Sequence, residues 1–447
     1  MKRILNFAVA LIIAGSAMAQ GNYTPTEENL KSRKEFADSK FGIFIHWGIS
    51  SIFGQGEWYL HRSQLNHQEY KKAADAFYPH RFDAKEWVAA IKDSGAKYIT
   101  FVSRHHDGFS MWDTAHSEYD IIDATPFKRD IIKELARECH RQGIRLHFYY
   151  SHIDWSRDDY PWPTDENAHR KRKVPGRDHY EGGYANYYKF MNNQLTELLT
   201  KYGKIGAIWF DGYWDQRHNA EKFEWGLDEQ YALIHKLQPG CLVGNNSHIA
   251  AQPGEDFQIF ERDLPGENKA GYSEGQEVTN HLPLETCQTM NKSWGYSVKD
   301  TAYKSSDELI RYLVSTSGKG ANLLLNIGPQ PNGEIPAAAL ERMKVMGEWL
   351  RKYGETIYGT TAGDLPAQDW GVTTRKGNRL FVHIFDLKDK TLRLPLNCTV
   401  KSAQTFDTKK PIKFTVAVDG VILHLDEVPS GTDYIVELKT DNNRKGR

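Results

Sequence analysis

The chain has 447 residues, more than a single hydrophobic core usually organises, so the sequence predicts more than one domain. Its 57 Lys and Arg residues balance 58 Asp and Glu residues, and its longest basic run, residues 169–173, is short. This argues against a dedicated nucleic-acid-binding protein. With 40% hydrophobic residues the chain is expected to fold, and its 12 Trp and 23 Tyr residues suit a sugar-binding cleft.

The first nineteen residues have the three parts of a secretory signal peptide. Met1–Arg3 is positively charged, residues 4–13 are mostly apolar, and Ala17–Ala19 fits the A-x-A cleavage pattern before Gln20. A buried N-terminal helix is the alternative, but it does not explain why all three parts occur in order. We therefore expect residues 1–19 to be removed and the mature chain to be periplasmic or extracellular. No later segment is apolar enough to predict a membrane span.

Residues 23–358 alternate between short apolar runs and amphipathic helical patterns. One helix start is marked by Ser305 and Glu308, which have the spacing of a capping box. Alternation of this kind with about eight strands predicts an α/β fold, a (β/α)8-like TIM barrel. The barrel is expected to be irregular where residues 262–285 show no helical pattern. The predicted strands are Phe41–His46, Lys97–Ser103, Ile144–Ser151, Ile205–Asp211, Cys241–Asn245, Phe257–Glu261, Thr286–Met290 and Ala321–Ile327.

Residues 366–440 differ in character, because short β-rich segments follow one another without helical patterns between them. Turn residues such as Val418–Gly420 and Pro429–Gly431 separate these segments. The pattern predicts a C-terminal all-β sandwich after a boundary near residues 358–368. The segments are Arg379–Phe385, Thr391–Leu396, Ile412–Val418, Val421–Leu425 and Tyr434–Leu438.

Polar and aromatic side chains collect where the predicted barrel strands end. His46, Asp211 and Glu261 close three of the apolar runs, while Arg104–Asp107 and Tyr149–His152 stand at the ends of two others. A parallel barrel places its active site at the carboxyl ends of its strands. We therefore expect these residues to meet in one pocket.

Asp211 is the strongest single candidate for a catalytic residue, because it directly follows the apolar run Ile208–Phe210. It also precedes Gly212, which lets a ligand approach the backbone. The alternative is an aspartate that only caps a helix or orders a loop. A second carboxylate facing Asp211 would suit glycoside hydrolysis, in which one group attacks the anomeric carbon and the other transfers a proton. In a retaining enzyme the two carboxylates lie about 5–5.5 Å apart.

A metal site is the competing interpretation of the histidines at the strand ends, His46, His105, His106 and His152. The sequence has no HxH or HExxH pattern, and the neighbouring His105 and His106 should point in opposite directions. Hydrogen bonds to sugar hydroxyls are favoured, with purely structural hydrogen bonds as the other alternative. The four Cys residues have neither zinc-motif nor disulfide-scaffold spacing, and residues 318–320 lack the spacing of a phosphate-binding loop. We therefore expect no metal and no cofactor, and the sequence leaves the pairing of the Cys residues open.

Six motifs follow one another in a characteristic order. They are Phe41–Gly48, Glu57–Tyr59, Arg104–Phe109, Trp209–Gly212, Leu284–Cys287 with Ser293–Tyr296, and Asn322–Pro329. Together they resemble the retaining α-L-fucosidases of glycoside hydrolase family 29 over most of residues 25–358. The resemblance implies a barrel followed by a β-sandwich, no metal, and removal of terminal α-L-fucose from fucosylated oligosaccharides or glycoproteins. It also implies a double displacement through a covalent fucosyl-enzyme intermediate.

The same resemblance assigns the nucleophile to Asp211. The residues that it places around the sugar are His46, Glu57, Trp58, His105, His106, Tyr150, Trp209, Arg262 and, against the methyl group, Trp294. The acid/base stays open, because in this family the proton donor lies on a variable loop. The candidates are Glu285 as first choice and Glu274 and Glu277 as alternatives, with Glu261 and Glu267 nearby.

Two other functions stay open. The chain could hydrolyse a related sugar such as a galactoside, or it could be a lectin-like protein that binds fucose or other glycans without catalysis. Asp211 and the several glutamates near Glu285 argue against loss of catalysis. The sequence indicates neither the oligomeric state nor the linkage preference nor the role of the C-terminal domain.

Overall fold

The computed structural model describes residues 23–162, 183–219 and 221–441. The predicted signal peptide, residues 1–19, and the basic run, residues 169–173, lie outside the described residues, so export stays a prediction. Within the described ranges no helix is both long enough and apolar enough to cross a membrane.

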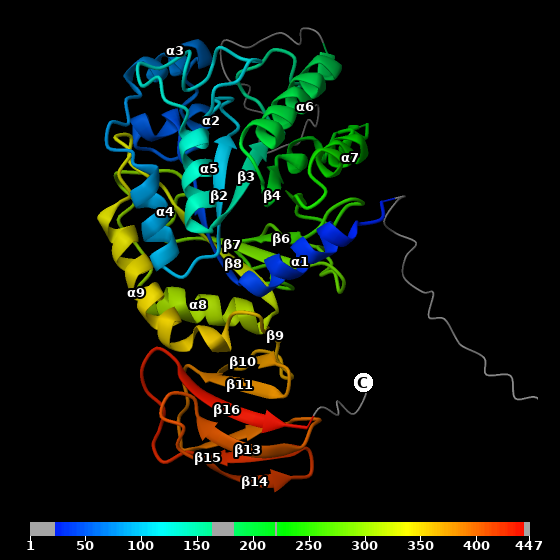
Figure 1. The fold of residues 1–447 in the computed structure, drawn as a ribbon, viewed down its shortest axis with the longest axis vertical. Helices are drawn as coiled ribbons and strands as arrows, with labels where there is room; N and C mark the ends of the chain where they lie inside the picture. Colours follow the sequence, from blue (N-terminus) through cyan, green and yellow to red (C-terminus); the bar gives the residue numbers. More distant parts are fainter. Residues whose placement is uncertain (1–22, 163–182, 220, 442–447) are drawn as a thin grey trace, which may run out of the picture.

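Eight parallel strands form a sheet that nearly closes into a barrel, which confirms the predicted fold class and the eight predicted strands (Figure 1). The order is β5-β4-β3-β2-β1-β8-β7-β6. The strands are β1 (Phe41–Ile45), β2 (Tyr98–Arg104), β3 (Arg145–Ser151), β4 (Ala207–Asp211), β5 (Leu242–Asn246), β6 (Gln258–Glu261), β7 (Leu284–Thr289) and β8 (Ala321–Ile327). Asp256 links the end strands: its N–H donates to the Val243 carbonyl at 2.7 Å, and its carboxylate accepts from the Val243 N–H at 2.8 Å.

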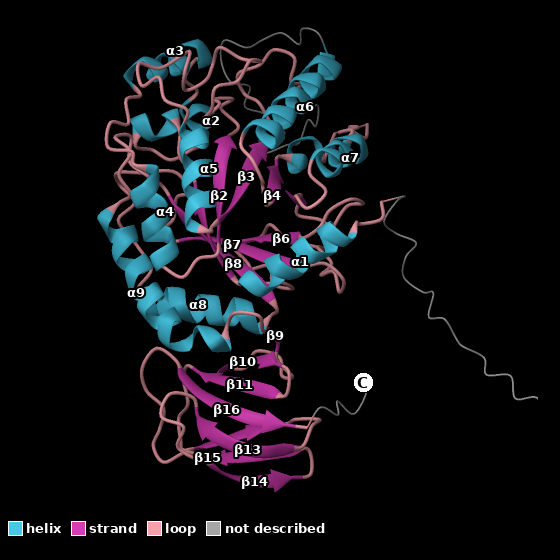
Figure 2. Cartoon of the chain, viewed as in Figure 1, coloured by secondary structure: helices cyan, strands magenta, loops and turns pink. Residues whose placement is uncertain are grey.

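Helices surround the barrel on the outside (Figure 2). They are α1 (Glu27–Ser39), α2 (Tyr59–Ser63), α3 (His67–Lys71), α4 (Ala84–Asp93), α5 (Ile131–Gln142), α6 (Gly183–Lys201), α7 (Leu227–Leu237), α8 (Ser306–Gly318) and α9 (Ala337–Tyr353). The capping box of Ser305 and Glu308 is present at the start of α8, as predicted. The connection from β6 to β7, described throughout, contains no helix, which confirms the expected irregularity.

Aromatic side chains fill the barrel interior and close its amino end. α1 carries Phe36 to this end, where the Phe36 carbonyl accepts a hydrogen bond from Nδ2 of Asn322 at 2.6 Å. Gly42 makes room for the ring of Tyr98, because a β-carbon at residue 42 would lie 2.4 Å from that ring. The packed amino end leaves the carboxyl ends of the strands as the place for a pocket.

The second domain consists of two antiparallel sheets that enclose their own apolar core, as the predicted sandwich requires (lower part of Figure 1). One sheet has the order β13-β16-β11-β10-β9, and the other has the order β12-β15-β14. The strands are β9 (Thr361–Ala362), β10 (Gly371–Lys376), β11 (Arg379–Ile384), β12 (Thr391–Leu394), β13 (Val400–Thr405), β14 (Lys413–Ala417), β15 (Gly420–His424) and β16 (Tyr434–Thr440).

The sequence pattern missed β9, β10 and β13, because these strands carry few apolar residues and their register depends on their partners β10, β11 and β16, respectively. Arg311 of α8 joins the second domain to the barrel. Its guanidinium donates to the carbonyls of Phe385, Gly431 and Thr432 at 2.8–3.0 Å. All four Cys residues carry free thiols.

Candidate active site

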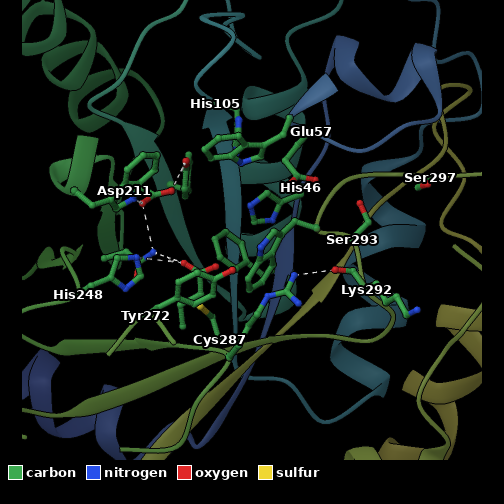
Figure 3. A pocket seen from close by; sticks show the side chains of 18 of the residues that line it. His46, Glu57, His105, Asp211, His248, Tyr272, Cys287, Lys292, Ser293 and Ser297 are labelled. Carbon is green, nitrogen blue, oxygen red and sulfur yellow. Dashed lines mark hydrogen bonds and ion pairs between the residues drawn. The ribbon is translucent and has the colours of Figure 1, made fainter. Parts of the chain in front are cut away.

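A cavity of about 1180 Å³ opens at the carboxyl ends of the barrel strands, where the sequence predicted a pocket (Figure 3). Its polar and aromatic wall comes from strand ends and the loops that follow them. Wall residues include His46, Glu57, Trp58, His105, Tyr149, Trp209, Asp211, Trp214, Asn246, His248, Glu261, Arg262, Tyr272, Glu274, Cys287 and Trp294. Seven of the nine residues predicted to surround the sugar are therefore in this wall, and Tyr150 and His106 are not.

Asp211 ends β4 and points into the cavity (Figure 3). Its Oδ1 accepts hydrogen bonds from Nε1 of Trp214 at 2.9 Å and from the backbone N–H of Gly212 at 2.8 Å. Its Oδ2 accepts from the Tyr149 hydroxyl at 3.0 Å and lies 3.5 Å from Nε2 of His106. Burial raises the pKa of the Asp211 carboxyl, whereas these donors favour its ionised form. The site thus holds a desolvated, oriented carboxylate.

Glu261 ends β6 and supplies a second carboxylate beside Asp211. Nδ2 of Asn246 lies between the two groups, 2.8 Å from Oε2 of Glu261 and 3.4 Å from Oδ1 of Asp211. These distances limit the separation of the two oxygens to about 6 Å, close to the 5–5.5 Å of retaining glycosidases. The charge of Glu261 also contributes to the raised pKa of Asp211. The two carboxylates are therefore close enough for one to act as nucleophile and the other as acid/base.

The opposite side of the cavity offers an imidazole and a carboxylate, each fixed by a hydrogen bond. Nδ1 of His46 is 2.6 Å from Oδ1 of Asn326, and burial lowers the pKa of His46 to about 3, so the imidazole is neutral. Oε2 of Glu57 accepts from the backbone N–H of Gly295 at 2.7 Å. A neutral imidazole and a carboxylate fixed in this way suit directional hydrogen bonds to hydroxyl groups.

Aromatic rings form the apolar part of the wall. The guanidinium of Arg262 lies over the Trp294 ring, 5.0 Å from the ring centre. The rings of Trp58 and Trp214 are stacked, with centres 5.8 Å apart. Such indole faces cover the carbon-bound hydrogens of a sugar, while the polar groups opposite read its hydroxyls.

The two neighbouring histidines after β2 point in different directions, as predicted from strand alternation. His105 lines the cavity, and burial holds its pKa well below the usual value. His106 lies behind the wall, where its Nδ1 is 2.6 Å from the Ser151 hydroxyl and its Nε2 faces Asp211. His106 therefore contacts the carboxylate instead of lining the cavity.

The prediction for Tyr150 is wrong by one residue. Its hydroxyl donates to Oε1 of Gln194 on α6 at 2.7 Å, so the ring lies outside the barrel and does not line the cavity. Successive side chains of a strand point to opposite faces, and Tyr149 is the residue that points inward. Tyr149 is therefore the tyrosine that reaches Asp211.

The first-choice acid/base, Glu285, is contradicted by its position. Its side chain is 0% exposed inside the barrel, where the carboxylate accepts from the Tyr98 hydroxyl at 2.5 Å and from Nε1 of Trp209 at 2.9 Å. Because Glu285 is near the start of β7, it lies behind the cavity wall formed by Trp209. Burial raises its pKa to about 7. Glu285 cannot touch a ligand in the cavity.

The structure also distinguishes between the other acid/base candidates, the glutamates on the β6–β7 connection. Glu274 lines the mouth of the cavity, whereas Glu277 does not and contributes its backbone carbonyl to Nε2 of Gln258 at 2.7 Å. Glu267 does not line the cavity either and forms a surface ion pair with Lys269. Glu261 and Glu274 are thus the glutamates of this region that reach the cavity.

Sequence reasoning missed several wall residues, including Trp214, Asn246, His248 and Tyr272. Asn246 had a usable signal, because it is the polar residue at the end of β5 and the predicted strand stopped one residue short of it. Trp214 lies in a short 3-10 helix after β4 and Tyr272 on the β6–β7 connection, and neither segment carries a local signal for the direction of a side chain. Within the described ranges, no group of three or more His, Cys, Asp or Glu side chains is arranged to hold a metal ion.

Comparison with known proteins gives one consistent result. The model of the α-L-fucosidase family matches residues 10–355. Plasma α-L-fucosidase of Rattus norvegicus is 31% identical over 419 residues, covering 86% of this chain and 84% of the relative. The human plasma enzyme is also 31% identical, over 81% of this chain and 78% of the relative.

Solved structures agree with the sequence comparison. The structure of α-L-fucosidase isoenzyme 1 from Paenibacillus thiaminolyticus has a TM-score of 0.79 and 32% identity, and the match covers 93% of this chain and all of that one. An α-L-fucosidase of family 29 from Bacteroides thetaiotaomicron has a TM-score of 0.80 and 26% identity, over 95% of this chain and 98% of that one. That structure contains a covalent intermediate trapped with 2-fluoro-fucosyl fluoride in a glutamate-to-glutamine variant.

Proposed function

Because the chain belongs to the α-L-fucosidase family of glycoside hydrolases, we propose that it removes terminal α-L-fucose from glycans with retention of configuration. The proposal rests on one observation above the others: Asp211 and Glu261 meet at the amide of Asn246 in the cavity wall. The separation of their oxygens, at most about 6 Å, is below the roughly 6.5–9.5 Å that inverting enzymes need to hold an additional water.

In the first step of this proposal, Asp211 attacks the anomeric carbon and forms a fucosyl ester. Glu261 donates its proton to the glycosidic oxygen, and the leaving alcohol departs as that C–O bond breaks. In the second step, the Glu261 carboxylate takes a proton from water, and the oxygen of that water displaces Asp211. The covalent intermediate trapped in the Bacteroides structure supports this course.

The remaining wall residues fit an exo-acting enzyme. His46, His105 and Glu57 present polar atoms on one side of the cavity, and Trp294 presents an apolar ring. A six-deoxy sugar needs both, because its hydroxyls require directional partners and its methyl group requires an apolar contact.

Azide rescue of Asp211→Gly and Glu261→Ala tests the two roles. Asp211→Gly should be nearly inactive, and with an activated aryl fucoside azide should give the inverted β-fucosyl azide. Glu261→Ala should lose about 10²–10⁴-fold with poor leaving groups, and azide should give the retained α-fucosyl azide. Proton NMR of the first sugar released by the wild type should show the α anomer.

Glu274→Ala is the competing variant, because Glu274 is the glutamate of the β6–β7 connection that lines the cavity. It should keep activity within a few-fold and give no azide product. A retained azide product from Glu274→Ala in place of Glu261→Ala would transfer the acid/base role to Glu274. A β anomer as the first product would refute retention.

A further inference from the structure

The cavity is larger than one sugar residue needs. Its volume of about 1180 Å³ exceeds the roughly 300–1,000 Å³ of pockets that hold drug-sized ligands, which are themselves larger than a monosaccharide. The inner wall comes from the strands, for example from Phe44 of β1, Trp209 of β4 and Cys287 of β7. Other wall residues lie on short helices beyond the strand ends, so the cavity continues outward. This outer part is where the sugar that carries the fucose would lie.

Two tryptophans of the outer part form a stacked pair. Trp58 directly precedes α2, and Trp214 lies in the 3-10 helix Tyr213–Gln216 after β4. Their rings are inclined at 23° to one another with centres 5.8 Å apart, and both residues line the cavity. Nε1 of Trp214 donates to Oδ1 of Asp211 at 2.9 Å, so the pair begins next to the proposed nucleophile. Indole faces in this position suit the apolar face of a second sugar ring.

Each of these tryptophans is followed, one helical turn later, by an arginine that also lines the cavity. The backbone N–H of Arg62 donates to the Trp58 carbonyl at 3.0 Å, and that of Arg217 donates to the Trp214 carbonyl at 3.4 Å. Both arginines are exposed, and within the described ranges neither guanidinium forms a hydrogen bond or an ion pair. Two uncompensated cations therefore stand one turn away from the indole pair.

The other charged groups of the outer wall do not neutralise these arginines. Lys292 and Lys299, on the connection from β7 to α8, add two more cations, and neither forms an ion pair with another described residue. Asp215 already accepts from a tyrosine hydroxyl at 2.5 Å, and Asp300 accepts from two backbone N–H groups at 2.7 and 2.8 Å. Glu274 is the third acidic side chain of the outer wall. Four cations thus face three carboxylates, two of which have donors of their own.

We propose that the outer cavity binds an anionic sugar, so that the enzyme removes fucose from acidic glycans. The inference rests on the proposed function and adds the chemical class of the sugar that carries the fucose. The ring of this second sugar lies against Trp58 and Trp214, and its carboxylate or sulfate ester meets the guanidinium groups of Arg62 and Arg217. A guanidinium suits either anion, because its planar fork of donors matches two oxygens and is weakly hydrated.

Three α-L-fucosyl disaccharides that differ at one carbon test the substrate class. The second sugar is galactose, galacturonic acid or galactose 6-sulfate, in the linkage that the wild type cleaves fastest. The kcat/KM for at least one anionic disaccharide should be about three- to tenfold above that for the neutral one, as expected for exposed ion pairs. The carboxylate and sulfate arms show which anion is preferred. The preference should shrink when NaCl is raised from about 0.05 M to about 0.5 M, because salt screens exposed charges.

Arg62→Gln and Arg217→Gln, singly and combined, test whether these two arginines cause the preference. The readout is the ratio of kcat/KM for the anionic disaccharide to that for the neutral one within each variant. This ratio should fall about twofold or more in each single variant and further in the double variant. Arg137→Gln is the matched control, because Arg137 of α5 is exposed and does not line the cavity. Its ratio should match that of the wild type, and thermal melting checks that each variant is folded.

Equal or lower kcat/KM for both anionic disaccharides in the wild type, or no cleavage of either, would overturn the acidic substrate class. A wild-type ratio that persists in the double variant would overturn the role of the two arginines. Release of fucose from 4-nitrophenyl α-L-fucoside, which is uncharged and has no second sugar, is scored separately. Absence of that release would overturn the proposed function itself, so the two failures are distinguishable.

Discussion

Replacement of Glu285 by Gln distinguishes a buried structural carboxyl group from an acid/base. Glu285 is closed off from the cavity and accepts hydrogen bonds from Tyr98 and Trp209. Gln has nearly the same shape but cannot ionise, so Glu285→Gln changes the charge without creating a cavity. The variant should therefore alter the pH dependence of stability far more than the chemistry.

The size of the stability difference between the wild type and Glu285→Gln follows from the raised pKa of Glu285. Burial raises the pKa of Glu285 from 4.5 to about 7, and each pKa unit corresponds to about 1.4 kcal/mol. The folded protein binds this proton more tightly than the unfolded chain does. The contribution to stability is therefore full below about pH 4.5 and is lost as the pH rises to about 7. Across this range the wild type should lose about 3 kcal/mol relative to Glu285→Gln.

Urea unfolding followed by tryptophan fluorescence measures this difference, because every tryptophan except Trp370 precedes the second domain in the sequence. The unfolding free energies of the wild type and of Glu285→Gln are compared at pH 4.5, 6 and 8, with the exposed Glu277→Gln as control. The difference should grow with pH for Glu285→Gln and stay constant for Glu277→Gln.

Activity provides the second readout. Glu285→Gln should keep kcat/KM within about tenfold, with equal effects on good and poor leaving groups, because it acts only through the position of Trp209. A constant stability difference between pH 4.5 and 8 would refute the burial argument. A loss of 10²–10⁴-fold that azide restores with retained configuration would restore Glu285 as the acid/base.

Two further predictions concern strand alternation and domain contact. Tyr149→Phe should lower kcat/KM about tenfold because it removes the donor to Asp211. Tyr150→Phe should instead lower the melting temperature and leave kcat/KM within about twofold. The reverse pattern would contradict the assigned orientations of the two side chains. Arg311→Ala removes three hydrogen bonds to the second domain and should destabilise it by about 1–3 kcal/mol. Calorimetry should show that domain melting earlier, and an unchanged trace would show that Arg311 does not stabilise the contact.

The sequence alone indicated the barrel fold and the end of the barrel at which the candidate active site lies. Buried parallel strands are near-continuous apolar runs bounded by polar residues, so Ile208–Phe210 followed by Asp211 gives both the strand and its end. The capping box before α8 marked a helix start in the same local way. These features depend on residues that are adjacent in the chain, so they can be recognised from the sequence alone. The polar strands β10 and β13 lack such a signal, and their pairing partners define them.

Only the tertiary structure decided which side chains share the cavity. The inward turn of Tyr149 instead of Tyr150 depends on the exact phase of β3, and a shift of one residue reverses it. The depth of Glu285 depends on how far β7 is staggered against β2 and β4, whose side chains hold its carboxylate. The approach of Glu261 to Asp211 depends on the near closure of the sheet, because fifty residues of chain separate strand ends that one amide of Asn246 joins. Local sequence sets the ends of strands, whereas stagger and closure of the barrel set the distances between them.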